Sequence, residues 1–85
     1  MSELDQIRNQ INDIDRDMAA LFQQRMKLSA QVAAFKKARG LSVRDAERER
    51  QLIDRNRGYI ADEDIGSYYV QFLRSVIDLS CAYQG

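Results

Sequence analysis

The chain has 85 residues, and its 13 Lys and Arg side chains balance 13 Asp and Glu side chains. A chain of this length forms one domain, residues 1–85, with a thin core unless it associates, and zero net charge gives no reason to expect nucleic acid or an anionic membrane as a partner. There is no His and only one Cys, Cys81, so the commonest general base is missing and neither an intrachain disulfide nor a cysteine-based zinc site is possible.

Targeting signals are not recognisable in the sequence. The N-terminal residues MSELDQIRNQ have no apolar h-region, and no stretch approaches the ~18 apolar residues of a membrane-spanning helix. We therefore expect a cytoplasmic protein with no membrane partner.

The first predicted element is one long helix over residues 4–39. Apolar residues recur with 3–4 spacing and form a sustained heptad seam, whose members are Leu4, Ile7, Ile11, Ile14, Met18, Leu21, Leu28, Val32 and Phe35. Arg25 occupies one seam position where an apolar residue is expected. The pattern stops at three basic residues and Gly40, a glycine suited to the left-handed position that ends a helix.

Two shorter helices follow. Ser42 and Asp45 resemble a capping box, which predicts a second helix from there to Gly58. The acidic residues 62–64 suit the start of a third helix, whose inward face comprises Ile65, Tyr69, Phe72, Leu73, Val76, Ile77 and Ser80. Because the sequence has no proline and no alternating strand pattern, we predict an all-α fold of three helices.

The length of the first helix indicates association. At 1.5 Å per residue it would extend roughly 54 Å, whereas a compact domain of this chain length has a radius of gyration of about 12 Å. The rest of the chain cannot cover such a seam. We therefore predict an intertwined homodimer in which the long helices of two copies pack together.

Charged residues occur on faces that should point inward. In the segment SVRDAERERQL, residues 42–52, the side chains of Asp45, Arg48 and Glu49 share a face with Leu52. On the first helix, Lys36 lies about 20° from Arg25 around the axis. Ser80 and Gln84 add polar groups at the end of the third helix, and Arg8 lies at the edge of the seam face.

Each of these residues alone has an ordinary explanation, because a long basic side chain can extend to solvent and one polar seam residue can set the register. Together they do not suit a structural core, since an unpaired buried charge costs several kcal/mol. Bases exceed acids in the set, and arginines bind carboxylates in a bidentate fashion. The set therefore predicts a pocket for a small ligand with several anionic groups.

The order of these residues resembles the all-helical class of chorismate mutases over essentially the whole chain. The matching positions are Arg8, Arg25, Lys36, Val43-Arg44-Asp45, Arg48-Glu49, Ser80 and Gln84. The resemblance implies rearrangement of chorismate to prephenate in aromatic amino-acid biosynthesis, on the branch to phenylalanine and tyrosine. This pericyclic shift needs no nucleophile, metal or obligatory proton transfer, so no cofactor is expected.

The resemblance also implies roles for the residues that bind carboxylates. Arg25, with Arg8 of the partner subunit, would hold the enolpyruvyl carboxylate. Arg48, helped by Ser80, would hold the ring carboxylate. The active site would then be shared between the two subunits.

By the same resemblance, Glu49 would accept a hydrogen bond from the ring hydroxyl, with the backbone of Asp45 nearby. Lys36 and Gln84 would donate to the ether oxygen, where negative charge grows as the C–O bond breaks. The implied catalytic residues are Arg25, Lys36, Arg48, Glu49 and Gln84. The side chain of Asp45 has a second explanation, because an N-terminal cap accounts for it without any ligand.

Two alternatives remain open from the sequence. Isochorismate–pyruvate lyases share the fold and use a similar basic pocket. A non-catalytic helical dimerisation or regulatory module would also form a dimer, but it would have no use for Lys36 and Gln84 together. We expect Cys81 to be a packed thiol, and Arg44, Arg50 and Arg57 to be solvated.

Overall fold

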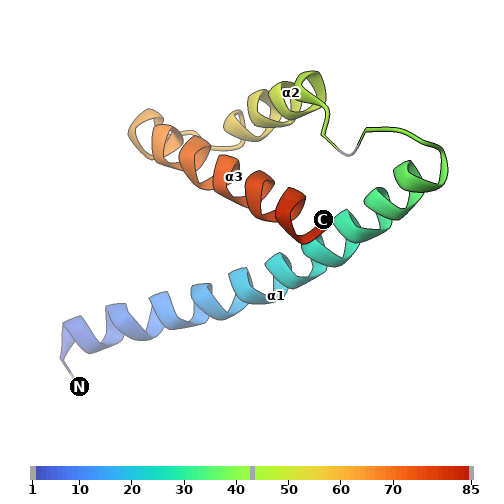
Figure 1. Ribbon diagram of the computed structural model, residues 1–85. Helices are drawn as coiled ribbons and strands as arrows, with labels where there is room; N and C mark the ends of the chain where they lie inside the picture. The colour runs from blue at the N-terminus through green and yellow to red at the C-terminus, as the bar shows by residue number, and fades with distance from the viewer. Residues whose placement is uncertain (1, 43, 85) are drawn as a thin grey trace.

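The computed structural model describes residues 2–42 and 44–84, and over these residues the chain forms three helices and no strand (Figure 1). The helices are α1 (Glu3–Ala38), α2 (Ala46–Arg57) and α3 (Glu63–Gln84). The predicted all-α class and its three helices are thereby confirmed. Val43, part of the matching motif, lies outside the described residues.

Both ends of α1 are capped, and the C-terminal end is the one that the sequence predicts at Gly40. The hydroxyl of Ser2 accepts a hydrogen bond of 3.1 Å from the backbone N–H of Asp5. At the other end, Gly40 adopts φ 67°, and the N–H of Leu41 reaches back to the carbonyl of Lys36 at 2.8 Å. This arrangement is a Schellman motif, in which a glycine in the left-handed region ends the helix.

The start of α2 differs from the prediction. Asp45 is itself the N-cap, and its Oδ1 accepts a hydrogen bond of 3.1 Å from the N–H of Arg48. The hydroxyl of Ser42 instead donates to the carbonyl of Arg44 at 2.9 Å. The predicted capping box is therefore wrong. Ser42 does not cap the helix, because its hydroxyl is bound to a carbonyl in the turn before α2.

The third helix contacts both of the others (Figure 1). Its first turn is stabilised by Asp62, whose Oδ1 accepts from the N–H groups of Asp64 at 2.9 Å and Ile65 at 3.2 Å. Among the described residues, the buried apolar side chains are those of Ala33, Leu73, Val76 and Ile77. Three of these four lie on α3, so this helix supplies most of a small core.

The apolar seam of α1 is not covered within one chain. Its nine apolar side chains, from Leu4 to Phe35, are between 47% and 62% exposed, and the N-terminal half of the helix projects beyond the rest of the fold (Figure 1). The molecule is 56 Å long with a radius of gyration of 16.2 Å, against about 12 Å for a compact chain of this length. In the described part of the chain, no helix has the combination of length and apolar character that crossing a bilayer requires.

Candidate functional site

A cavity of about 140 Å³ lies between the three helices, and we call it the central cavity. Its lining comes from all three helices and comprises Arg25, Ser29, Val32, Lys36, Asp45, Arg48, Glu49, Leu52, Ile77, Ser80, Cys81 and Gln84. Seven of the eight residues that the sequence nominated for the site are in this set. The eighth, Arg8, is not.

The N-terminal turn of α2 presents its charged residues to the central cavity. Asp45, Arg48, Glu49 and Leu52 all line it, as their helical spacing predicts. The cap formed by Asp45 determines where the helix begins and therefore which face carries these side chains. The carboxylate of Asp45 serves this cap, so its side chain has a structural role independent of any ligand.

Ser80 connects the basic residues of α1 to the end of α3. Its hydroxyl accepts a hydrogen bond of 2.8 Å from Nη1 of Arg25 and donates one of 2.8 Å to the carbonyl of Val76. Ser80 is buried, at 5% exposure. The resemblance associates Ser80 with Arg48, whereas its partner in this structure is Arg25.

The end of α3 is attached to α1 by Gln84. The side-chain Nε2 of Gln84 donates to the backbone carbonyl of Ser29 at 2.9 Å, and the backbone carbonyl of Gln84 accepts from Nζ of Lys37 at 3.1 Å. Because an amide nitrogen carries two N–H groups, the bond to Ser29 leaves one donor for a ligand. Lys36 lines the same cavity from the last turns of α1, so both side chains expected at an ether oxygen are present.

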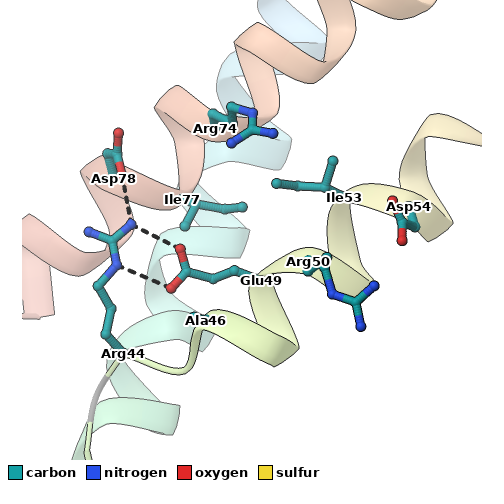
Figure 2. Close-up of a pocket in the computed structure, with 9 residues that line it drawn as sticks. All are labelled: Arg44, Ala46, Glu49, Arg50, Ile53, Asp54, Arg74, Ile77 and Asp78. Atoms are coloured by element: carbon teal, nitrogen blue, oxygen red, sulfur yellow. Dashed lines mark hydrogen bonds and ion pairs between the residues drawn. The ribbon is translucent and has the colours of Figure 1, made fainter.

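Glu49 is paired with a residue that the sequence interpretation did not place in the site. Arg44 donates from Nε to Oε2 at 3.1 Å and from Nη2 to Oε1 at 2.9 Å, and its Nη2 also donates to Oδ1 of Asp78 at 2.8 Å (Figure 2). Arg44 is exposed, as expected, but the expectation missed its pairing with Glu49 and Asp78. Helical periodicity could not identify Arg44, because it precedes the first residue of α2; its place in the matching motif was the available signal.

The same contacts perturb the titration of both groups. Hydrogen bonds from Arg44 lower the pKa of Glu49 below its usual value of 4.5. The hydrogen bonds to Glu49 and then to Asp78 raise the pKa of Arg44. Glu49 is thus a carboxylate at neutral pH and can only accept hydrogen bonds.

A second cavity of about 440 Å³, the outer cavity, also borders Glu49 (Figure 2). Its lining comprises Arg44, Ala46, Glu49, Arg50, Ile53, Asp54, Arg74, Ile77 and Asp78. Glu49 and Ile77 line both cavities. The Glu49 side chain therefore borders both the candidate site and a larger, charged cavity.

Arg8 is too far along α1 to reach the central cavity of its own chain. It precedes Arg25 by 17 positions in the same continuous helix, which corresponds to about 25 Å along the axis at 1.5 Å per residue. An extended arginine side chain covers only a fraction of that length. Any contact of Arg8 with a central cavity must therefore come from another copy of the chain.

Comparison with known proteins identifies the family. Residues 7–85 match the family described as Chorismate mutase type II. The chain belongs to this family. Among curated proteins, the chorismate mutase of Methanocaldococcus jannaschii is 34% identical over 77 residues, which cover 86% of this chain and 78% of that protein. No solved structure gives a significant match.

Membership of the chorismate mutase type II family confirms the predicted activity. The chain is an isomerase that rearranges chorismate, and neither the lyase nor the non-catalytic module is favoured. The all-helical fold agrees with the family.

Proposed function

We propose that chorismate is rearranged to prephenate in the central cavity of a homodimer, and that each cavity is completed by Arg8 of the partner subunit. We propose further that this reaction serves phenylalanine and tyrosine synthesis in the cytoplasm, with chorismate and a second copy of the chain as the partners. The observation that carries the proposal is the gathering of seven nominated polar residues around one cavity, while the eighth lies about 25 Å away along α1.

The exposed seam of α1 supports the dimer. Side chains such as Ile11, at 49% exposure, and Leu21, at 62%, form an apolar stripe, interrupted only at Arg25, that the described chain leaves about half exposed. A stripe of this kind on a soluble protein is typical of an interface, because burying it removes apolar surface from water. A second copy offers a stripe of the same length and spacing.

Substrate binding in the proposed site depends on the arginines. Chorismate carries two carboxylates, and Arg25 and Arg48 reach the central cavity from different helices. A guanidinium donates two parallel hydrogen bonds to a carboxylate, so each arginine fixes the orientation of one anionic group. Holding both carboxylates restricts the flexible substrate to the compact shape that reacts.

Catalysis in the proposed site depends on Lys36 and Gln84. During the rearrangement the ether C–O bond breaks while a C–C bond forms in the same molecule, so negative charge grows on the ether oxygen. Donors aimed at that oxygen bind the transition state more tightly than the ground state. An acceleration of ~10⁶ requires ~8 kcal/mol, of which one donor of this kind supplies ~3–4 kcal/mol. Two donors and the enforced conformation are together sufficient.

A pair of variants at the seam tests the proposal. Ile11→Asp places a charge in the exposed stripe, whereas Asn9→Asp places the same charge about 160° away around the helix. Ile11→Asp should be monomeric by native mass spectrometry and should lose chorismate turnover, while Asn9→Asp should remain dimeric and active. A fully active Ile11→Asp monomer would contradict the shared site.

The assay itself separates the activities. Loss of chorismate absorbance with formation of prephenate is expected of the unmodified protein. Release of pyruvate from isochorismate at a comparable rate would instead indicate a lyase, and no turnover of either compound would indicate a non-catalytic module.

A further inference from the structure

Glu49 is held by a residue that does not line the central cavity. Both of its oxygens accept hydrogen bonds from Arg44, at 2.9 and 3.1 Å, and Arg44 lies in the outer cavity (Figure 2). A carboxylate has about four lone-pair sites. The fork of Arg44 uses one on each oxygen, so acceptor capacity remains for the central cavity that Glu49 also lines.

Arg44 is itself fixed by a third residue. Its Nη2 donates to Asp78 at 2.8 Å, and Asp78 lies on α3, two positions before Ser80. Arg44 therefore ties the start of α2 to the part of α3 that lines the central cavity. Because the Arg44 side chain is 53% exposed and that of Asp78 is 67% exposed, solvent screens these pairs and they add little to the stability of the fold. These pairs instead fix the orientation of the Arg44 and Glu49 side chains.

The surroundings of Glu49 explain why an orienting partner is needed. Charged or titratable groups from all three helices line a cavity with Glu49 or act on its partner. They are Arg25 and Lys36 from α1, Arg44 and Asp45 before α2, Arg48, Arg50 and Asp54 on α2, and Arg74, Asp78 and Cys81 from α3. Without Arg44, the Glu49 side chain would still share the central cavity with three bases, Arg25, Lys36 and Arg48. Pairing with one of these would remove a group that the proposed function assigns to the substrate.

We infer that Arg44 is a positioning residue for the chorismate rearrangement: it holds the Glu49 carboxylate at the wall of the central cavity, as an acceptor for the substrate, and away from the bases that bind the substrate's anionic groups. This inference rests on the proposed function of Glu49. It adds a residue from outside the cavity, and the hydrogen bonds that lower the pKa of Glu49 are those that orient it.

A double-mutant cycle tests the inference. Arg44→Ala should lower kcat/KM by about tenfold, with a raised KM, because Glu49 then competes for the substrate's bases. In a Glu49→Ala background the same change should have no further effect. Arg44→Lys keeps the charge but not the fork, so it should fall between Arg44→Ala and the unmodified protein.

Arg50 offers a matched control. It also lines the outer cavity, but its guanidinium binds Glu47, at 2.6 and 3.2 Å. Carboxyl titration followed by NMR should show the Glu49 midpoint rising in Arg44→Ala and unchanged in Arg50→Ala, whose kcat/KM should also be unchanged.

The outcomes separate the two proposals. If Arg44→Ala causes the same loss with and without Glu49, or leaves the Glu49 midpoint unmoved, the positioning role of Arg44 is overturned. If Glu49→Ala alone is fully active, the proposed role of Glu49 fails first and that of Arg44 with it. Should Arg44→Ala not fold, Arg44→Lys completes the same cycle and the same titration.

Discussion

Nη1 of Arg25 lies 2.8 Å from Oγ of Ser80 and donates a hydrogen bond to it, joining α1 to α3 across 55 positions of sequence. Ser80 is the acceptor of this bond because a guanidinium can only donate, and its own proton is donated to the carbonyl of Val76. Before any ligand arrives, the guanidinium that we assign to a substrate carboxylate is therefore already oriented by a buried hydroxyl.

Ser80→Ala should reveal that orientation. Removing the acceptor leaves Arg25 free to rotate, which should lower kcat/KM by about five- to tenfold, corresponding to a hydrogen bond of ~1–1.5 kcal/mol. The loss should appear mainly as a raised KM, because Arg25 already binds the substrate carboxylate in the ground state. Ser75→Ala is the control, since Ser75 donates to the carbonyl of Gln71 in the same helical geometry but is exposed. Equal effects of the two variants on kinetics would refute the orienting role.

Lys36→Ala should affect turnover far more than binding. The proposed contact is made to charge that develops on the ether oxygen, and loss of one such donor lowers kcat by about 10²–10³. Lys27→Ala removes the same charge from an exposed position of α1 that does not line the central cavity, and its kinetics should match those of the unmodified protein. A raised KM with unchanged kcat in Lys36→Ala would exclude the transition-state role.

Much of this arrangement was predictable from helical periodicity. The spacing of Asp45, Arg48, Glu49 and Leu52 placed them on one face, and that face lines the central cavity. The heptad seam predicted a helix too long for one compact domain, and α1 extends well beyond α2 and α3 with its seam exposed (Figure 1).

What periodicity could not predict lies outside the helices or depends on three-dimensional contact. Arg44 precedes α2 and so has no helical phase, and its pairing with Asp78 spans 34 positions. Ser and Asp are both common N-cap residues, and only the backbone geometry shows that Asp45, and not Ser42, is the N-cap of α2. The partner of Ser80 likewise depends on how α1 and α3 cross.

Glu49→Gln should retain more activity than Glu49→Ala. The amide carbonyl of Gln can still accept from the ring hydroxyl, whereas Ala leaves that hydroxyl without a partner. Gln offers Arg44 one acceptor instead of two, however, so some activity should be lost relative to Glu. Steady-state kinetics of both variants check this order, and equal losses would show that the negative charge itself is required.

The Arg44–Glu49 pair should contribute to stability in a pH-dependent way. The pKa of Glu49 is lowered in the folded state, so the folded chain binds this proton less readily than the unfolded chain. The contribution is therefore fully present above the unfolded pKa, near 4.5, and is lost as pH falls through the lower folded value.

Urea unfolding at pH 7 and at pH 3, at one protein concentration, measures this effect. Because solvent screens this exposed pair, the free energy of unfolding should be only slightly lower for Arg44→Ala than for the unmodified protein at pH 7, and the difference should shrink at pH 3. Arg50→Ala, whose partner is Glu47, controls for loss of a surface charge. A difference that is larger at pH 3 would have the wrong sign for this pair.

The last prediction concerns Arg8 and the sharing of sites. Arg8→Ala and Arg25→Ala homodimers should each be severely impaired, because every cavity lacks one of its carboxylate-binding arginines. In a mixed dimer, the cavity of the Arg8→Ala chain keeps its own Arg25 and receives an intact Arg8 from its partner, while the other cavity lacks both. Random pairing of equal amounts makes half of the dimers mixed, so about a quarter of the sites and of the unmodified activity should return.

The experiment is to unfold the two variants together, refold them and assay chorismate, with each variant refolded alone as the control. Native mass spectrometry of the mixture establishes that mixed dimers have formed. If both arginines served a cavity within one chain, every chain would stay defective whatever its partner, and the mixture would show only the average of its parents. Arg8 and Arg25 of one chain lie about 25 Å apart along α1, so a single chain cannot bring both arginines to one cavity. Mixed dimers without recovery would therefore remove Arg8 from the active site altogether.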